Sequence, residues 1–336
     1  MTNWNNLPNE IKMMCVKSMN LVTRTRLKMC SKSDEKLVKS TKFTLDYCSI
    51  VYDDGFCEND RLNIVMDLDD IVLHFKQVDS TDCQIGRLVD DTLARTINTS
   101  NTMLHEALIA FKSIVLDANI HFEIVKIYVP ILNNPIINTP GRIKTSQIVA
   151  EPNGLPIASH VLSDFAYWIK KCDPRYLDGI YVRERGSIKG MSRAIENFNI
   201  KTICCPIETD ITNEQLLDLL RFDFEFGCSI LSTDIDSKGI NKFLLKLITK
   251  QLSESSSFVI ASTRSLNHAE VMKDVPMMLR EANRARIRLP DQKILELSFC
   301  DTGVRGVILS ENGEYATWED EYRPPPTLKH YDFSNK

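Results

Sequence analysis

The sequence predicts an α+β protein in which a small all-α head of three short helices precedes an α/β body. Two observations lead to this fold class. Apolar residues recur at helical spacing near the N-terminus, and helix-like and strand-like segments alternate from residue 157 onward. Alternation of this kind builds a parallel sheet covered by helices. The expected divisions are residues 1–42, 43–156 and 157–322, followed by a tail over residues 323–336.

The composition is that of a folded protein. Of the 336 residues, 43% are hydrophobic and 26% are charged, which excludes wholesale disorder. No run of 18 apolar residues and no signal-like start occurs, so we expect neither a membrane-spanning nor a secreted protein. The ten cysteines form no CxxC pair, which favours reduced thiols in the cytoplasm and/or nucleus over disulfides or zinc. No cofactor is expected.

Charge is distributed unevenly along the chain. Residues 1–42 hold nine Lys and Arg against three acidic residues, a net charge of +6, whereas the whole chain carries -4. The remainder therefore carries -10. A basic head on an acidic body suits an acidic partner protein or nucleic acid, and a solvated helix surface is the alternative.

The first predicted helix, residues 7–19, begins with a proline that suits a first helical turn. Ile11, Met14, Cys15 and Met19 follow one helical face, whereas Met13 and Val16 fall on another. A helix that is apolar on two sides needs two partners. Further helices are expected over 24–30, after a Thr23 cap, and over 34–40, from Ser31 or Ser33. Three helices this short cannot bury enough area to be stable alone.

These residues carry a family resemblance. The matching positions are Leu7-Pro8-x-Glu10-Ile11, Val16, Met19, Arg24 and Leu27-Lys28-x-Cys30-Ser31-Lys32. The pattern resembles the F-box, and more narrowly the F-box set of nematodes, in which an F-box-associated domain, often of the FTH type, follows. The sequence differs at Ser33-Asp34, where many F-boxes carry Trp.

The resemblance implies that the head docks on an acidic SKP1-type adaptor and, through cullin, on a ubiquitin ligase. The adaptor-binding residues that it implies are Leu7, Pro8, Ile11, Val16, Met19 and Leu27. The net charge of the head agrees with an acidic partner independently of the resemblance.

The first part of the body reads as strands at 43–52, 62–66 and 71–78, joined as an antiparallel meander with a turn at Asp53-Asp54-Gly55. An amphipathic helix over 101–118 and a strand over 122–129 come next. Residues 130–156 contain several Pro, Asn and Gly turn signals and are expected to form a long loop.

The second part alternates regularly. Helices are expected at 157–172, 187–198, 212–222, 237–253 and 268–286, and strands begin at 178, 200, 228, 257 and 293. Steps of 22 to 36 residues between strand starts fit a degenerate leucine-rich-repeat-like α/β solenoid, although the LxxLxLxxN signature is missing. A compact doubly wound sheet is the rival architecture.

A solenoid would present alternate strand residues to a protein target. The predicted outward residues are Tyr181, Arg183, Val259, Ala261, Glu296 and Ser298, and the inward ones are Ile180, Val182, Phe258, Ile260, Leu295 and Leu297. We take Tyr181, Arg183, Val259, Glu296 and Ser298 as the target-binding candidates.

Two other clusters could carry chemistry. Asp67-Leu68-Asp69 after an apolar strand resembles the first motif of haloacid-dehalogenase phosphatases, but Asp70 and Ile71 stand where that family has a small residue and Thr. Arg280, Arg284, Arg286 and Arg288 form a basic cluster, which we interpret as a solvated helix edge. The acidic body and the lack of interleaved aromatic residues argue against nucleic-acid binding.

The predicted function is therefore that of a substrate-recognition subunit of an SCF-type (SKP1-cullin-F-box) ubiquitin ligase, without an active site of its own. Its partners would be the adaptor, cullin through the adaptor, and an unknown protein target, with no nucleic acid and no membrane. The alternatives are an interaction solenoid whose head merely caps the repeat stack, and a haloacid-dehalogenase-like phosphatase.

Overall fold

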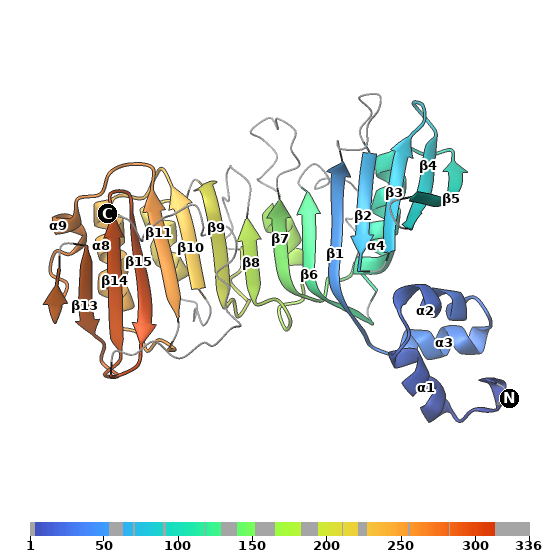
Figure 1. Ribbon diagram of the computed structural model, residues 1–336, viewed down its shortest axis with the longest axis horizontal. Coiled ribbons are helices and arrows are strands. Elements are labelled where there is room, and N and C mark those ends of the chain that lie inside the picture. Colours follow the sequence, from blue (N-terminus) through green and yellow to red (C-terminus); the bar gives the residue numbers. More distant parts are fainter. Residues whose placement is uncertain are drawn as a thin grey trace. The chain divides into compact units, whose positions relative to one another are not determined.

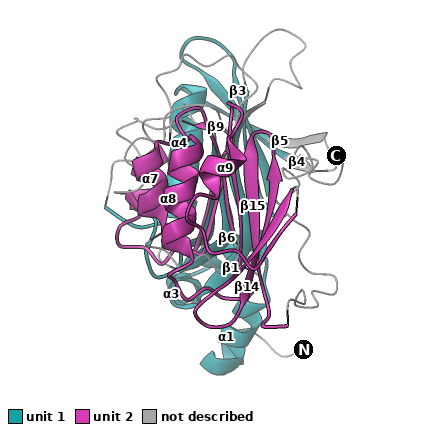
Figure 2. Cartoon of the chain, turned by 90° about the vertical axis from the view of Figure 1, so that its left-hand side faces the viewer, with its two compact units in different colours: residues 1–148, 153–156, 171–176 teal, residues 149–152, 157–170, 177–336 magenta. Residues whose placement is uncertain are grey.

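A computed structural model describes residues 4–53, 63–69, 71–89, 92–117, 119–128, 140–151, 165–182, 194–209, 211–220, 227–254, 256–281 and 283–312. The chain forms two compact units (Figure 2). Unit 1 comprises residues 1–148, 153–156 and 171–176, and unit 2 comprises residues 149–152, 157–170 and 177–336. None of the described helices is long and apolar enough to cross a membrane.

Unit 1 begins with the helical head (Figure 1). A 3-10 turn, η1 (Trp4–Asn6), precedes α1 (Asn9–Lys17), α2 (Leu21–Lys28) and α3 (Lys32–Ser40). The three predicted helices are thus confirmed, and α3 packs against both α1 and α2. The predicted Thr23 cap of the second helix is wrong. Asn20 caps α2 by accepting a hydrogen bond from the Thr23 amide, and Ser31 caps α3 as one of the two expected residues.

The rest of unit 1 is built around a mixed sheet. Its strands are β1 (Phe43–Asp53), β2 (Asn63–Leu68), β3 (Ile71–Gln77), β4 (Cys83–Val89), β5 (Thr92–Thr99) and β6 (Ile120–Tyr128). They lie in the order β6-β1-β2-β3-β4-β5. The predicted antiparallel meander β1-β2-β3 is confirmed, and β6 is parallel to β1. The expected turn at Asp54-Gly55 lies outside the described residues.

Helix α4 (Met103–Val115) returns the chain from β5 to β6. Its apolar stripe, including Leu108 and Phe111, is buried against β1 to β4. The long loop expected over residues 130–156 is wrong in its second half, where β7 (Thr145–Glu151) pairs beside β6. The β-formers Ile148 and Val149 lie in this strand, and both are buried.

Unit 2 contains most of the predicted α/β alternation, and the helix expected over 187–198 lies largely outside the described residues. Its elements are α5 (Phe165–Lys171, shared with unit 1), β8 (Gly179–Val182), β9 (Thr202–Thr209), α7 (Asn213–Leu219), β10 (Gly227–Ser232), α8 (Ser237–Leu247) and β11 (Ser257–Ser262). The four strands are parallel and follow one another in chain order. Helices α7, α8 and α9 (His268–Val271) lie on the same side of these strands (Figure 2).

The end of unit 2 differs from the prediction. The helix expected over 268–286 is four residues of α9, and the chain then forms β12 (Leu279–Arg280), β13 (Arg284–Arg288), β14 (Ile294–Cys300) and β15 (Gly303–Leu309). These strands are antiparallel and continue the sheet in the order β11-β15-β14-β13-β12. Pro276 has no backbone N–H to donate to a helix. Residues 284–288 alternate between exposed or half-buried Arg and buried Ala or Ile.

The body is therefore an α/β structure, but a leucine-rich-repeat-like solenoid is not confirmed. The repeating parallel unit spans β8 to β11, and the strands that follow are antiparallel. The predicted inward register is confirmed, because Ile180, Ile260 and Leu297 are all fully buried. The Phe258 ring packs against Phe243 of α8 with centroids 5.4 Å apart, which places this row of residues on the helix-covered face.

Candidate functional site: the helical head and the outer sheet face

Helix α1 exposes large apolar side chains. Ile11 and Met14 are 42% and 66% exposed, and their i,i+3 spacing puts them on one face. Met13 is also exposed, and Met29 at the end of α2 is 74% exposed. Four of the ten large hydrophobic residues exposed in the described part of the chain thus lie in this short head. Such a concentration is typical of an interaction site. We call Ile11 and Met14 the α1 patch.

The structure separates the six predicted adaptor-binding residues into three groups. Pro8 and Ile11 are exposed, whereas Leu7, Met19 and Leu27 are half-buried. Val16 is 0% exposed and therefore belongs to the head's own small core rather than to an accessible surface. Sequence reasoning missed Met14 and Met29. Met14 could have been found, because it lies three residues after Ile11 on the same apolar stripe.

The segment before α1 is tied to α3. The Trp4 indole Nε1 donates a hydrogen bond of 2.9 Å to Asp34 Oδ1, and Ser31 Oγ donates one of 2.6 Å to Asp34 Oδ2. Lys12 Nζ lies 5.9 Å from the Trp4 ring centroid. The hydrogen bonds from Ser31 and Trp4 lower the pKa of Asp34 below its ordinary value. This tether positions the start of α1.

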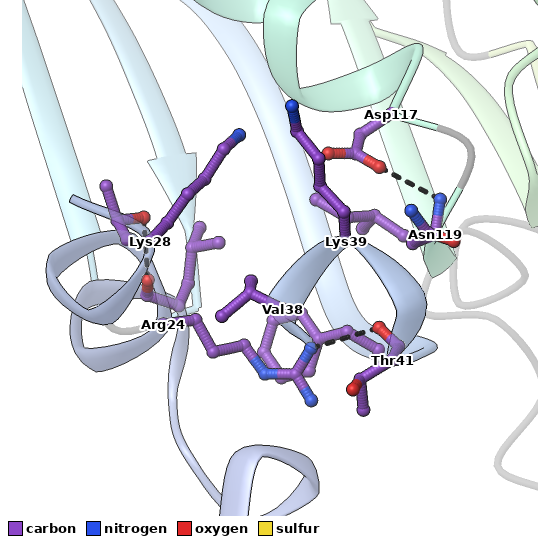
Figure 3. A pocket seen from close by; sticks show the side chains of 11 residues that line it. Arg24, Lys28, Val38, Lys39, Thr41, Asp117 and Asn119 are labelled. Carbon is purple, nitrogen blue, oxygen red and sulfur yellow. Dashed lines mark hydrogen bonds between the residues drawn. The ribbon is translucent and has the colours of Figure 1, made fainter. Parts of the chain in front are cut away.

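Arg24 joins the head to the sheet of unit 1. Its side chain is 4% exposed, and its guanidinium carbon lies 4.0 Å from the Phe43 ring centroid. Arg24 Nε donates to the Met19 carbonyl at 3.3 Å. Arg24 Nη1 donates to the Thr41 carbonyl at 3.4 Å (Figure 3). Burial lowers the pKa of Arg24. Since Phe43 is the first residue of β1, these contacts connect α2 directly to the sheet.

A pocket of about 70 Å³ lies beside this connection (Figure 3). Lys28 and Lys39 of the head line it, together with Asp117 and Asn119 after α4. The Phe43 amide donates to the Asn119 carbonyl at 2.8 Å, which fixes the turn against β1. Cofactor and drug-sized ligand sites are about 300–1,000 Å³ in volume. The pocket is therefore too small for a cofactor and lies where the head joins the sheet.

Unit 2 carries the second candidate surface, on the side of the sheet opposite α8. Residues that lie directly opposite one another in neighbouring strands share a face. One such row runs across β8, β9, β10, β11, β15, β14 and β13 through Tyr181, Cys204, Ser229, Val259, Arg305, Ser298 and Arg284. Three predicted target-binding residues (Tyr181, Val259 and Ser298) therefore lie in this row, and Glu296, two residues before Ser298 on β14, lies on the same outer face.

Their exposure differs from the prediction. Tyr181 and Ser298 are half-buried, but Val259 and Glu296 are 6% and 7% exposed, so the expectation that these two are accessible is wrong. Val259 lies on β11, which is flanked by β10 and β15, and Ser229 and Arg305 lie directly opposite it on these strands. Ala261, also expected outward, is buried as well.

Glu296 forms an ion pair with Arg286 of the neighbouring strand β13. Arg286 Nε and Nη2 lie 2.8 and 2.7 Å from its Oε2 atom. The remaining candidate, Arg183, lies outside the described residues. The arginines of the predicted basic cluster do not form a helix edge: Arg280 lies on β12, and Arg284, Arg286 and Arg288 lie on β13.

The Asp67–Asp69 motif has a structural role. The Asp69 carboxylate accepts hydrogen bonds from the amides of Asp46 and Tyr47 at 3.0 and 2.8 Å, and its backbone has a positive φ of 49°. Burial, and then the charge of Asp69, raise the pKa of Asp67. Lys126 lies in electrostatic range, but its Nζ is 4.8 Å from the Tyr47 ring centroid.

A phosphatase of the haloacid-dehalogenase type needs an ionised first Asp as nucleophile and a free second Asp as proton donor. Here burial disfavours the ionised form of Asp67, and the Asp69 carboxylate accepts hydrogen bonds from backbone amides. Within the described residues, no group of three or more His, Cys, Asp or Glu could hold a metal ion. The motif closes the β2–β3 turn against β1, and this geometry does not favour phosphoryl transfer.

Comparison with known families agrees with the geometry of the head. Residues 4–46 match the F-box domain, a range that covers η1, the three helices and the first residues of β1. No curated protein and no solved structure matches the chain. The match supports an F-box protein, and F-box domains bind SKP1-type adaptors. F-box proteins are typically non-catalytic ligase subunits that recognise substrates.

Proposed function

We propose that the chain is the substrate-recognition subunit of an SCF-type ubiquitin ligase, in which the head binds a SKP1-type adaptor and the body binds a target protein. The observation that carries the proposal is the exposed α1 patch within the F-box match. Leu7, Pro8, Met19 and Leu27 would complete the adaptor contact. Ubiquitin transfer would take place on other subunits, which the adaptor reaches through cullin.

The physical chemistry of the head supports this assignment. Two exposed aliphatic side chains on one helical face gain roughly 25 cal/mol for each Å² of apolar surface that a partner covers. The net charge of +6 over residues 1–42 would speed association with an acidic adaptor. The Arg24–Phe43 contact supports a role as a receptor, because it couples the adaptor-binding helices to the strand at which the body begins.

The identity of the body remains part of the proposal. We propose that the body is an F-box-associated domain like those of the nematode F-box set, in which the FTH type is common. Its outer sheet face would be the target-binding surface. The parallel unit β8 to β11, with helices on one side, supports a short solenoid-like repeat there. All nine cysteines in the described ranges are free thiols, which suits the cytoplasm or nucleus.

The test is calorimetric titration of the full chain with a purified SKP1-type adaptor. The double variant Ile11→Ala/Met14→Ala should bind at least about 10-fold more weakly, because each truncated side chain loses about 1 kcal/mol of burial. Ile97 and Ile109 are exposed aliphatics of the body. The variant Ile97→Ala/Ile109→Ala is therefore a matched control and should bind normally.

Circular dichroism would check that both variants remain folded. Wild-type protein that does not bind the adaptor at tens of micromolar would refute the proposal. Equal loss of affinity in the two double variants would refute the assignment of the α1 patch.

A further inference from the structure

Strand β13 presents a row of arginines. Arg284, Arg286 and Arg288 alternate with Ala285 and Ile287, which are 1% and 0% exposed. Alternate residues of a strand point to the same face and are roughly 6.8 Å apart. Ala285 lies opposite Leu297, in the row that also contains Phe258 and faces α8. The three arginines therefore lie on the outer face.

A fourth arginine extends the row into a patch. Arg305 of β15 lies opposite Ser298 of β14, which lies opposite Arg284. Because neighbouring strands are about 4.8 Å apart, the backbones of Arg305 and Arg284 are separated by roughly 10 Å, with a serine hydroxyl between them. We call Arg284, Arg288, Arg305 and Ser298 the outer arginine patch.

Most of the positive charge of this patch is uncompensated. Among the described residues of β13 to β15, Glu296 is the one acidic residue on the outer face, and it forms an ion pair with Arg286. Arg288 donates to the neutral Gln292 side chain at 3.1 Å. Arg284 and Arg305 are exposed and have no carboxylate partner among the described residues. Glu281 follows β12, and its amide donates to the Arg284 carbonyl at 2.8 Å, so one acidic side chain lies at the end of this row. A local charge of about +2 thus stands on a body that carries -10.

Apolar side chains border the patch. Leu279 of β12 lies opposite Arg286 and is 49% exposed, and Met278 beside it is 51% exposed. The described outer face of β13 to β15 contains no aromatic side chain, because Phe299 lies in the row that faces α8. Binding of single-stranded nucleic acid normally uses aromatic stacking platforms. The patch therefore favours an acidic peptide over an oligonucleotide.

We infer that the outer arginine patch binds an extended, acidic segment of the target protein. Carboxylates at alternate positions of an extended chain are spaced like the arginines of β13, so the two rows can pair without distortion. Apolar residues flanking the acidic segment would contact Met278 and Leu279. The inference rests on the proposed function and adds to it the chemical class of the target.

The probe is a fluorescein-labelled twelve-residue peptide of alternating Glu and Ser, titrated with the full chain at low salt. We expect saturable binding that weakens as salt is added, and at least tenfold weaker binding of the matching Gln-Ser peptide. The double variant Arg284→Gln/Arg305→Gln should bind the acidic peptide about 5- to 20-fold more weakly, as expected for the loss of two partly exposed ion pairs.

Arg280 supplies the control. It is exposed, but it lies opposite Ala285 and so belongs to the other face of the sheet. Arg280→Gln should therefore leave peptide binding unchanged. Equal affinity for the Glu and Gln peptides, an equal effect of Arg280→Gln, or tighter binding of a twelve-nucleotide single strand would each overturn the inference. Adaptor titration of the same protein is independent of this face, so it distinguishes failure of the inference from failure of the proposed function.

Discussion

The guanidinium carbon of Arg24 lies over the ring of Phe43, 4.0 Å from its centroid, where α2 meets the start of β1. The arginine belongs to α2 and the phenylalanine to the sheet, so the contact joins two elements that are separated along the chain by residues 29–42, including α3. Since Arg24 is almost fully buried, the interaction is desolvated, and such cation–π contacts contribute about 2 kcal/mol. The position of α1 and α3 relative to the unit 1 sheet therefore depends on this pair.

Replacing Arg24 by Met should loosen the head without unfolding the sheet. The loss of about 2 kcal/mol corresponds to roughly 30-fold faster hydrogen exchange of the α2 and α3 amides through local opening. Exchange in β1 to β3 should change little. Arg26 is exposed on the same helix, so Arg26→Met controls for the loss of a positive charge. Unchanged exchange in α2 and α3 of Arg24→Met would show that the contact is dispensable.

Acid should release the tether between Trp4 and Asp34. The pKa of Asp34 is lower in the folded protein than the ordinary Asp value of about 3.9. A group of this kind adds stability above its unfolded pKa, and that stability is lost as the pH falls through its folded pKa. The NMR resonance of the Trp4 indole proton should therefore be constant from pH 7 to pH 5 and shift below about pH 4.

In Asp34→Asn, that acid shift of the Trp4 resonance should disappear. A midpoint above the ordinary Asp value in the wild-type protein would contradict the lowered pKa of Asp34.

Alkylation should distinguish the head cysteines from those of the body. Cys30 is exposed and Cys15 is half-buried, whereas Cys48 and Cys205 are fully buried. Burial raises the pKa of the Cys48 and Cys205 thiols, and the thiolate is the reactive form. With iodoacetamide at pH 8, mass spectrometry should detect modification at Cys30 first. Cys48 and Cys205 should react after denaturation, and early labelling of either would contradict their burial.

Gly306 should not tolerate alanine. A Cβ atom at this position would lie 2.2 Å from a ring carbon of Phe258, whose ring is already packed against Phe243. Overpacking of this kind costs about 1–3 kcal/mol, so thermal unfolding of Gly306→Ala should begin at a lower temperature. Phe258→Leu opens space for the added methyl group. If the double variant Gly306→Ala/Phe258→Leu is no more stable than the sum of the two single effects predicts, the two residues do not compete for space.

The head was largely predictable because its signals are local. Periodic apolar residues and the Ser31 cap define α1 and α3, and the alternation of β-formers predicts β1 to β3. The predicted N-cap of α2 was three residues too late, because Asn20 and Thr23 both have side chains that can cap a helix. The sequence also indicated part of the exposed surface proposed to bind the adaptor, because Ile11 and Met14 belong to one apolar stripe of the predicted helix.

The end of unit 2 was not predictable in the same way. Residues 268–286 contain helix formers such as Ala269 and Met272, and the alternating pattern that identifies β13 is five residues long. Pairing of β13 with β14 then outweighs local propensity. The burial of Val259 and Glu296 depends on the neighbouring strands, as the ion pair between Arg286 and Glu296 shows, and the alternation within a single strand contains no such information.

The sheet of unit 2 ends at β12, a strand of two residues. A short edge strand offers a second molecule few unpaired backbone groups, and charged side chains there oppose edge-to-edge contact. Arg280 and Glu281 supply such charges. A parallel repeat would by itself leave a full-length strand open for further strands to join. The antiparallel strands after β11 replace that edge with this short one, and they thereby protect the protein against end-to-end polymerisation.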